Sequence, residues 1–582
     1  MLNFYVFLSD IQFNTVSMTF FYKHKKKLIL SLCISLLASL FSFGPDYFEI
    51  SKNLDIFNAV YRELNAIYVD GTQPGKLMKV GIDAMLESLD PYTVYYSEND
   101  VEDFRYMTTG EYGGIGATVN DMDGKIIIAE PYEGFAAFKA GLRAGDQIIG
   151  VNGNNVLGRT TNDISNLLKG TAGTSLTLKI IKPGQKDAVV YTLMREEIKT
   201  KAVPYYGMLQ NSQTGYIKLV SFTENCSAPV KEAFLDLKSK GCKNLVLDLR
   251  GNLGGFLNEA VNIVNFFVAK GQEVVFTKGK MAEWDKTYLT VNNPIDTLMP
   301  LILLVDENSA SASEIVSGAL QDLDRAVIIG KRTYGKGLVQ QTKALIYNST
   351  VKITVAKYYI PSGRCVQALD YSNKNAEGRV EKVPDSLITA FKTKRGRIVY
   401  DGAGVMPDLL SKNEININLL MSLINKHHLF NYATDYCINH KNINAVNAFS
   451  LSDEEYIDFV NYLKNKDYKY QTEDELQLQD LQAQAIEENT FNEFKTEFEA
   501  LKTKLEEIKK KDLMTYKAVI KKYLEEEIVS RFYFQKGRIE LSLLHDDEVK
   551  QSISLLEDNK KLDLILSQII KPTKPFNLKK KF

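Results

Sequence analysis

The alternation of short apolar runs with amphipathic stretches in residues 197–410 constrains the fold more than any other feature of the chain. Runs rich in β-branched and aliphatic residues predict strands, whereas apolar residues spaced three and four apart predict helices. Buried strands alternating with helices are typical of a layered α/β core. The predicted elements are strands at 215–222, 244–249, 300–305 and 326–329 and helices at 228–240, at 257–268 and after Ser313.

Two of the predicted strands end in turns that lead directly into helices. The first turn is the glycine-rich segment 251–255, and the second contains Ser309, Ser311 and Ser313 alternating with alanines. The start of a helix has unpaired N–H groups and the positive end of the helix dipole, so either turn can stabilise an oxyanion. The local pattern allows two interpretations of the serines, a helix cap provided by Asn308 or Ser309 and an acyl-transfer nucleophile.

The positions of the histidines limit the chemistry available to such a nucleophile. The chain has five histidines, and none lies between residues 25 and 426. This excludes a Ser-His-Asp triad within that region and a Cys-His pair using Cys226, Cys242 or Cys365. Lysine is the recognised substitute base, and the glycine-flanked Lys336 is suitable if burial lowers its pKa towards ~7–8.

The composition excludes several other classes of function. A length of 582 residues predicts about four domains, and a net charge of −1 argues against a nucleic-acid or lipid-surface footprint. Five widely spaced cysteines and the lack of clustered Cys/His motifs predict no disulfide framework, no metal site and no cofactor. Residues 330–336 imitate a phosphate-binding loop, but Gly337 stands where Mg²⁺ coordination requires Ser or Thr, which disfavours an ATPase.

The N-terminal region predicts export. A basic cluster at 23–27 precedes the apolar run 28–43, so residues 1–44 are predicted to be a cleaved export signal or a retained membrane anchor. The remainder is then exported, either periplasmic or anchored in the inner membrane facing the periplasm. Residues 45–104 are predicted to be a helical segment.

Residues 105–196 are predicted to be a small β-rich module with a helix at 161–168. The run 140–153, AGLRAGDQIIGVNG, resembles a PDZ domain. PDZ domains add a peptide to a sheet edge and bind its terminal carboxylate with backbone N–H groups. By this resemblance, the carboxylate loop comprises Gly114, Ile115, Gly116 and Ala117, and the partners are proteins or peptides with free C-termini.

The order of motifs in the chain resembles the carboxy-terminal processing peptidases, the tail-specific proteases of the S41 family. The motifs are the PDZ module followed by DLRGNLGG at 248–255, SASASE at 309–314, YGKGLVQ at 334–340 and YYIPSGR at 358–364. The resemblance implies a ClpP/crotonase-like α/β serine protease core at 197–410 with an inserted PDZ domain and a helical C-terminal region. It implies an exported serine endopeptidase that binds and cleaves C-terminal tails.

Specific roles follow from the same resemblance. Ser311 is the implied nucleophile, Lys336 the general base and Gln340 the residue that orients the lysine. The Ala312 and Gly254 N–H groups are the implied oxyanion hole. The alternative is a non-catalytic PDZ adaptor or chaperone, but a pure binder needs none of the three catalytic side chains.

Residues 411–582 are charged and predicted to be mainly helical. Apolar residues spaced three and four apart between Phe491 and Ile508 form a heptad-like seam. This seam predicts a long amphipathic helix that packs within the C-terminal region, and the alternatives are partner binding or a homo-oligomer.

Overall fold

A computed structural model describes residues 45–374, 379–411 and 417–567, so the predicted export signal or anchor lies outside the described residues. None of the helices described has the length and apolar content needed to cross a bilayer. The chain forms two compact units, Met1–Met85 and Leu86–Phe582. In the first unit, α2 (Pro45–Ile67) is joined to α3 (Pro74–Glu87) where the Tyr61 hydroxyl donates to the Pro74 carbonyl at 2.8 Å.

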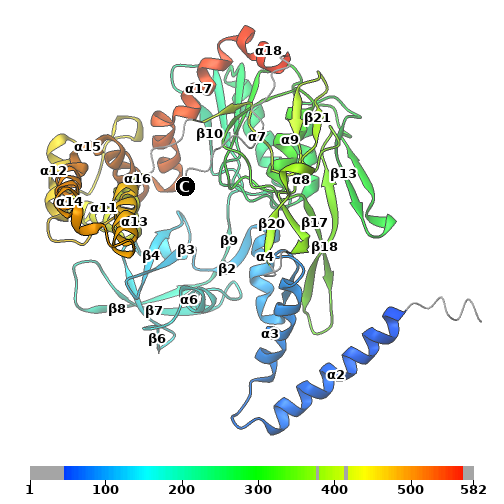
Figure 1. Cartoon of the computed structure of the whole chain (residues 1–582), viewed down its shortest axis with the longest axis horizontal. Helices are drawn as coiled ribbons and strands as arrows, with labels where there is room; N and C mark the ends of the chain where they lie inside the picture. Colours follow the sequence, from blue (N-terminus) through cyan, green and yellow to red (C-terminus); the bar gives the residue numbers. More distant parts are fainter. Residues whose placement is uncertain (1–44, 375–378, 412–416, 568–582) are drawn as a thin grey trace, which may run out of the picture. The chain divides into compact units, whose positions relative to one another are not determined.

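The second unit contains a six-stranded sheet that confirms the predicted α/β core (Figure 1). Five of its strands are parallel, and the edge strand β10 is antiparallel to β11. In order across the sheet, the strands are β10 (Tyr205–Met208), β11 (Thr214–Lys218), β12 (Asn244–Asp248), β15 (Leu301–Val305), β16 (Val327–Gly330) and β23 (Leu409–Leu410).

Helices cover both faces of this sheet, because successive strand residues belong to two different hydrophobic clusters. Leu245 and Leu247 of β12 pack in one cluster with α7 (Ser227–Ser239), α8 (Leu257–Asn265) and α9 (Ala312–Asp322). Val246 packs in the other cluster with α17 (Asp547–Leu556) and α18 (Asn559–Ser567). The predicted C-terminal region 411–582 therefore also completes the α/β core.

The loop 331–337, which carries Lys336, runs from β16 of the six-stranded sheet to an antiparallel sheet in the same unit. The strands of this antiparallel sheet are β1 (Val94–Tyr96), β18 (Thr350–Tyr359), β13 (Glu273–Gly279) and β14 (Lys286–Leu289), with β17 (Leu338–Ala344) also paired to β18. Although residues 45–104 are predicted to be helical, β1 pairs with β18 in register Tyr95↔Val351. Three residues are too short to show a strand periodicity, so this pairing is not visible in the sequence.

The PDZ domain is confirmed, with α6 (Thr161–Leu168) and a buried cluster of aliphatic residues. The predicted carboxylate loop joins β2 (Glu111–Gly114), which pairs with β9 (Glu196–Lys199), to β3. The other elements are β3 (Ala117–Met122), β4 (Lys125–Pro131), α5 (Ala136–Lys139), β5 (Gln147–Val151), β6 (Asn154–Asn155), β7 (Ser175–Ile181) and β8 (Ala188–Met194).

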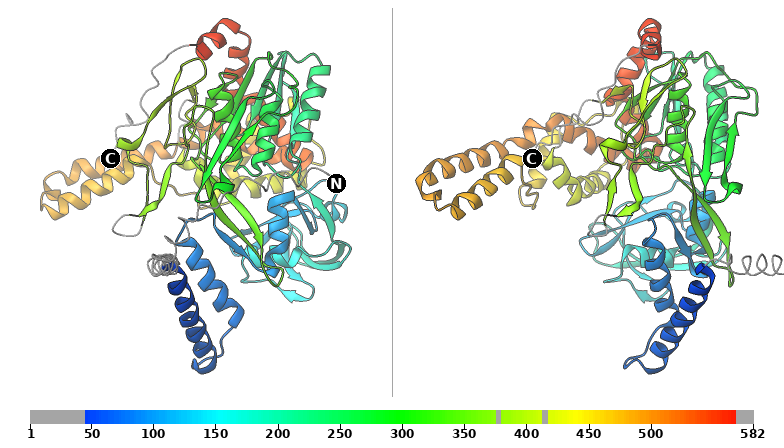
Figure 2. Two further views of the ribbon diagram at one scale, coloured as in Figure 1. Left: turned by 90° about the vertical axis from the view of Figure 1, so that its right-hand side faces the viewer. Right: turned by 45° about the vertical axis from the view of Figure 1, so that its right-hand side comes forward.

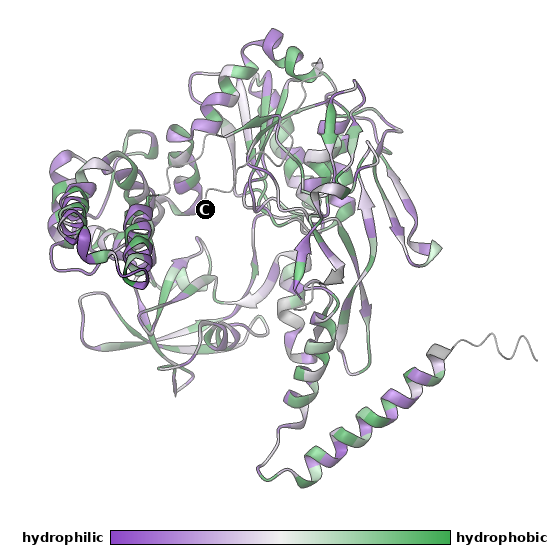
Figure 3. Cartoon of the chain, viewed as in Figure 1, coloured by the Kyte–Doolittle hydropathy of each residue, from purple (hydrophilic) through white to green (hydrophobic). Residues whose placement is uncertain are grey.

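The C-terminal region is helical, as predicted, with its own hydrophobic core. Most of the predicted Phe491–Ile508 seam lies in α14 (Lys495–Lys509), but its first part forms a separate 3-10 turn, Phe491–Glu493. In Figure 2, α14 lies beside α13 (Glu473–Glu487). Both helices are largely hydrophilic in Figure 3, and Phe498 is the buried residue of α14. The remaining helices are α10 (Asn418–Asn425), α11 (His428–Asn439), α12 (Asp453–Leu463), α15 (Asp512–Thr515) and α16 (Lys517–His545), which is kinked at Phe534.

Candidate active site

The structure distinguishes the three serines that precede α9. Ser309 is buried, and its hydroxyl donates to the Leu249 carbonyl at 2.9 Å. Ser313 is also buried, and its hydroxyl donates to the Asn252 carbonyl at 2.8 Å. Ser311 is partly exposed, and its side chain forms a capping box with Glu314 at the start of α9. Unlike the other two hydroxyls, that of Ser311 donates no hydrogen bond to any described residue. The outer two serines therefore fasten the turn to the glycine-rich segment, and Ser311 is available to react.

The backbone of Ser311 adopts a conformation that few non-glycine residues adopt. Its φ is 54° and its ψ is −111°, which costs of order 1–3 kcal/mol. Two contacts hold this conformation: the Ser311 N–H donates to Glu314 Oε2 at 2.8 Å, and the Tyr358 hydroxyl donates to the Ser311 carbonyl at 3.2 Å. A strained turn at a helix start is a known way of presenting a nucleophilic serine.

The glycine-rich turn lies directly against this serine. A Cβ on Gly254 would lie 2.6 Å from the Ala310 carbonyl oxygen, 2.8 Å from the Ser311 Cβ and 2.9 Å from the Ala312 nitrogen. Gly254 also has a φ of +95°, which disfavours any side chain. Only glycine fits here, so the structure brings together the two turns that were predicted separately.

The two predicted oxyanion donors differ in their present hydrogen bonds. The Ala312 N–H has no partner among the described residues, whereas the Gly254 N–H donates to Asn252 Oδ1 at 2.9 Å. The neighbouring Gly255 N–H has no partner in the same part of the chain, because the bridge to Phe222 uses the Gly254 carbonyl and the Phe256 N–H. The oxyanion-hole assignment stays a prediction, with Gly255 as the second available amide.

Gly254→Ala is expected to lower kcat/KM for peptide hydrolysis by at least about 100-fold, because the added methyl displaces the Ser311 and Ala312 backbone. Gly251→Ala is the matched control: Gly251 lies in the same turn with φ +71°, but its added Cβ would meet nothing within 4 Å. Initial rates of both purified variants test this. Equal losses for the two variants would show that backbone strain, and not the close approach at Gly254, controls the site.

Lys336 lies between β16 and β17 and is partly buried. Burial, together with the positive charge of the nearby Lys352, lowers the pKa of Lys336 to about 8, although Glu314 and Asp90 oppose the shift. A substantial fraction of the amine is therefore uncharged near neutral pH, as a general base requires. The Lys336 Nζ lies 4.2 Å from the centre of the Tyr92 ring.

Glu314 connects the serine turn to the lysine loop. It is fully buried in α9, and its Oε2 accepts from the backbone N–H groups of Ser311 and Lys336, each at 2.8 Å. Its Oε1 accepts from the Gly335 N–H at 2.7 Å and the Thr333 hydroxyl at 2.6 Å. Burial raises the pKa of Glu314 to about 7, against these hydrogen bonds. No role was expected for Glu314 from the motifs, although the S-x-x-E spacing is that of a capping box.

The side chains of the predicted dyad are not hydrogen-bonded to each other. In the described part of the chain, no hydrogen bond joins Ser311 Oγ to Lys336 Nζ, and none joins Gln340 to Lys336. The Gln340 amide donates instead to Thr354 Oγ1 on β18 at 3.2 Å. The structure thus brings Ser311 and Lys336 together through their backbones, and the orienting role of Gln340 stays a prediction.

An ionic network at the start of the glycine-rich turn extends to the C-terminal helices. Arg250 pairs with Asp248 at 2.6 Å, with Asp546 at 2.8 Å and with Glu548 at 2.7 Å. Burial alone would raise the pKa of Asp248, but Arg250 and Lys218 hold it well below its usual range. Residues around the start of α17 therefore help to fix the turn that carries Gly254.

The predicted carboxylate loop also has available donors. The carbonyls of Ile115 and Gly116 accept from the N–H groups of Ala137 and Tyr132, at 2.9 and 2.7 Å. The N–H groups of Ile115 and Gly116 themselves have no partner among the described residues. This arrangement suits a carboxylate.

Comparison with known proteins identifies the protease core, the PDZ domain and the helical C-terminal region. Sequence models match peptidase family S41 at residues 213–371, a PDZ domain at 127–182 and the C-terminal helical domain of probable PDZ-proteases at 419–556. The chain is 36% identical over 322 residues to a carboxy-terminal-processing protease of Bartonella bacilliformis, covering 55% of this chain and 73% of the relative. It is 33% identical over 316 residues to the carboxy-terminal processing protease CtpA of Bacillus subtilis, covering 54% and 67%.

Among solved structures, the photosystem II D1 C-terminal processing protease is similar to this chain at 28% identity. The match covers 62% of this chain and 93% of that one, with a TM-score of 0.34.

Proposed function

This chain belongs to the carboxy-terminal processing proteases of peptidase family S41, and from that membership we propose that it cleaves protein C-terminal tails with a Ser311–Lys336 dyad. It is a serine-type protease with a PDZ domain. The observation that carries the dyad is that Ser311, unlike Ser309 and Ser313, donates its hydroxyl proton to no described residue, while Glu314 holds its backbone beside that of Lys336.

The proposed reaction begins with a movement of the lysine side chain. Lys336 turns from the Tyr92 ring towards Ser311, and its neutral amine takes the hydroxyl proton as Oγ attacks the scissile carbonyl. The Ala312 N–H and a glycine N–H of the 254–255 turn stabilise the tetrahedral oxyanion. The Lys336 ammonium then gives its proton to the leaving amine, which leaves the substrate's acyl group as an ester on Ser311 Oγ. Water hydrolyses this acyl-enzyme and releases the new C-terminus.

Substrate capture is assigned to the loop Gly114, Ile115, Gly116 and Ala117. The two N–H groups of this loop that have no partner among the described residues would donate to the terminal carboxylate, while the tail adds to the edge of the PDZ sheet. A free C-terminus is then the feature that selects a substrate.

Amidating the C-terminus of a tail peptide is expected to weaken its binding at least about tenfold, because the charge-assisted hydrogen bonds are lost. Fluorescence anisotropy with matched acid and amide peptides measures this. The same tails attached to a test protein report cleavage in parallel. Equal affinity for acid and amide would rule out carboxylate capture by this loop.

A further inference from the structure

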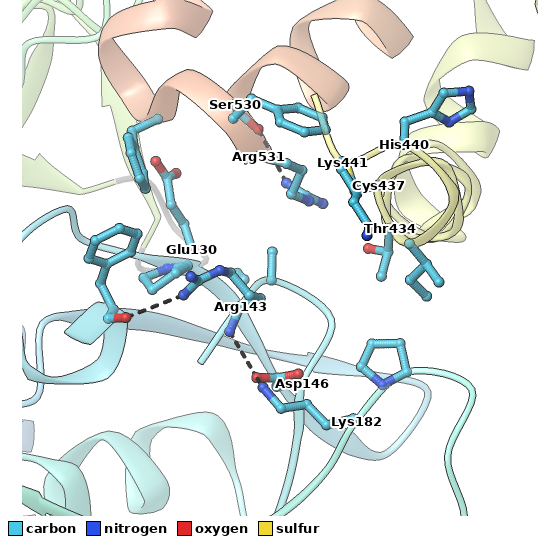
Figure 4. A pocket seen from close by; sticks show the side chains of 18 of the residues that line it. Glu130, Arg143, Asp146, Lys182, Thr434, Cys437, His440, Lys441, Ser530 and Arg531 are labelled. Carbon is cyan, nitrogen blue, oxygen red and sulfur yellow. Dashed lines mark hydrogen bonds and ion pairs between the residues drawn. The ribbon is translucent and has the colours of Figure 1, made fainter. Parts of the chain in front are cut away.

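A cavity of about 560 Å³ lies in the second unit, away from the proposed catalytic residues (Figure 4). One wall comes from β4, α5 and the segments flanking β5 and β7 of the PDZ domain, and the other comes from α11, the residues just after it, and α16. None of its lining residues belongs to the carboxylate loop 114–117 or to α6. It is therefore distinct from the proposed tail-binding groove.

Arg531 of α16 lines this cavity with a buried guanidinium group. Its side chain is 8% exposed. Its Nη1 donates a hydrogen bond to Ser530 Oγ and forms an ion pair with Glu527, each at 3.2 Å. Nε and Nη2 are shielded from solvent and have no hydrogen-bond partner. Phe430 covers one face of the guanidinium, 4.3 Å from its central carbon. Nε and Nη2 form one edge of the planar group, which is the edge that binds two oxygens side by side.

The charges around the cavity favour an anion. Arg143, Lys182 and Lys441 line it together with Arg531, against the two acids Glu130 and Asp146. Lys182 pairs with Asp146 at 2.6 Å. Arg538, which lies outside the lining, is 3.7 Å from Glu130. Both acids are therefore balanced by other cations. Glu527 pairs with Nη1 of Arg531, and the edge formed by Nε and Nη2 has no hydrogen-bond partner among the described residues.

Three phenylalanines and several aliphatic residues form the apolar part of the lining, and its uncharged polar members are Gln185, Thr434, His440 and Ser530. The Phe138 and Phe534 rings meet edge to face with their centres 5.2 Å apart, joining the PDZ side to α16. Phe534 lies at the kink of α16, with φ 56°. The other apolar lining residues are Ala129, Pro131, Ala144, Pro183, Ile438 and Phe532.

We propose that this cavity is a binding site for a small monocarboxylate with an apolar body. The two carboxylate oxygens would accept from Nε and Nη2 of Arg531, and the body would pack against the phenylalanines. A phosphate dianion suits the site less well, because Glu130 and Asp146 face the same space. The carboxylate belongs either to a free organic acid or to the terminal residue of a peptide, and in either case the ligand bridges the PDZ domain and α16.

Calorimetric titration of the full-length protein tests the site with four probes. Phenylacetate represents the organic acid and N-acetylphenylalanine the terminal residue of a peptide. Phenylacetamide is the neutral control, and inorganic phosphate is the competing anion. Binding of phenylacetate assigns a free acid, and binding of N-acetylphenylalanine alone assigns a peptide terminus. No binding of either acid, equal binding of phenylacetamide, or tighter binding of phosphate would overturn the proposal.

Variants on α16 distinguish the contribution of the guanidinium edge to binding from that of positive charge alone. Arg531→Gln is expected to weaken binding of the acid probe at least about tenfold. Arg531→Lys keeps the charge but loses the planar fork, so it should also weaken binding and decides the matter if the glutamine variant does not fold. Lys536→Gln removes an exposed charge from the same helix and should leave affinity unchanged. Wild-type affinity in Arg531→Lys, or an equal loss in Lys536→Gln, would contradict the assignment.

Discussion

Replacing Ser311 by alanine is expected to lower kcat/KM for tail cleavage by at least about 1,000-fold, because the nucleophile and its base act as one unit. Tail binding should be unchanged, since the proposed carboxylate loop 114–117 lies in the PDZ domain and does not include Ser311. Cleavage of a tail-bearing test protein and anisotropy of a labelled tail measure the two properties separately.

The neighbouring serines are the matched controls. Ser309→Ala and Ser313→Ala each remove a buried hydroxyl that donates to the glycine-rich segment, so each should reduce the free energy of unfolding by about 1–3 kcal/mol. Both should retain measurable cleavage at temperatures where they are folded. If Ser311→Ala cleaved at the wild-type rate while a flanking alanine variant was folded but inactive, the nucleophile would be misassigned.

Cleavage by the wild-type protein is expected to rise with pH and to level off above about pH 8. The neutral amine of Lys336 is the active form, and burial lowers the pKa of Lys336 to about 8. The protonated form therefore dominates below that pH and the reactive form above it. Lys336→Ala should lose at least about 1,000-fold in kcat/KM at every pH. A pH profile of kcat/KM with a short peptide measures the midpoint.

Two lysine variants sharpen this test. The positive charge of Lys352 helps to lower the pKa of Lys336, so Lys352→Met should move the midpoint to higher pH. Lys343→Met removes an exposed charge from the neighbouring strand β17 and should leave the midpoint in place. An unchanged midpoint in Lys352→Met would mean that another group titrates in the profile.

Elements with a strong local pattern were predictable. The apolar run at 244–249 became β12 (Asn244–Asp248), and the helix at 161–168 was predicted at its observed bounds. The motif positions of Ser311 and Gly254 also led to adjacent backbone segments. The strand, the helix and the two turns rested on periodicity and turn chemistry in consecutive residues, whereas the choice of Ser311 and Gly254 within the turns rested on the family resemblance.

The interactions that were not predicted are long-range. Tyr92 reaches Lys336 because β1 pairs with β18, more than 250 residues later in the chain. Asp546 and Glu548 bind Arg250 because α17 packs on the sheet of the α/β core. A local pattern carries no information about such partners. The contact of Glu314 with Ser311 could have been predicted, because their spacing is that of a capping box. Its contacts with the lysine loop could not, because they depend on the fold.

The most direct test of the Ser311–Lys336 dyad is the site and rate of labelling by a fluorophosphonate, mapped by peptide mass spectrometry across a pH series. The dyad predicts one adduct, on Ser311, forming faster as the pH rises through about 8 and lost in Lys336→Ala. An adduct on another residue, or labelling of Ser311 at an unchanged rate in Lys336→Ala, would contradict it.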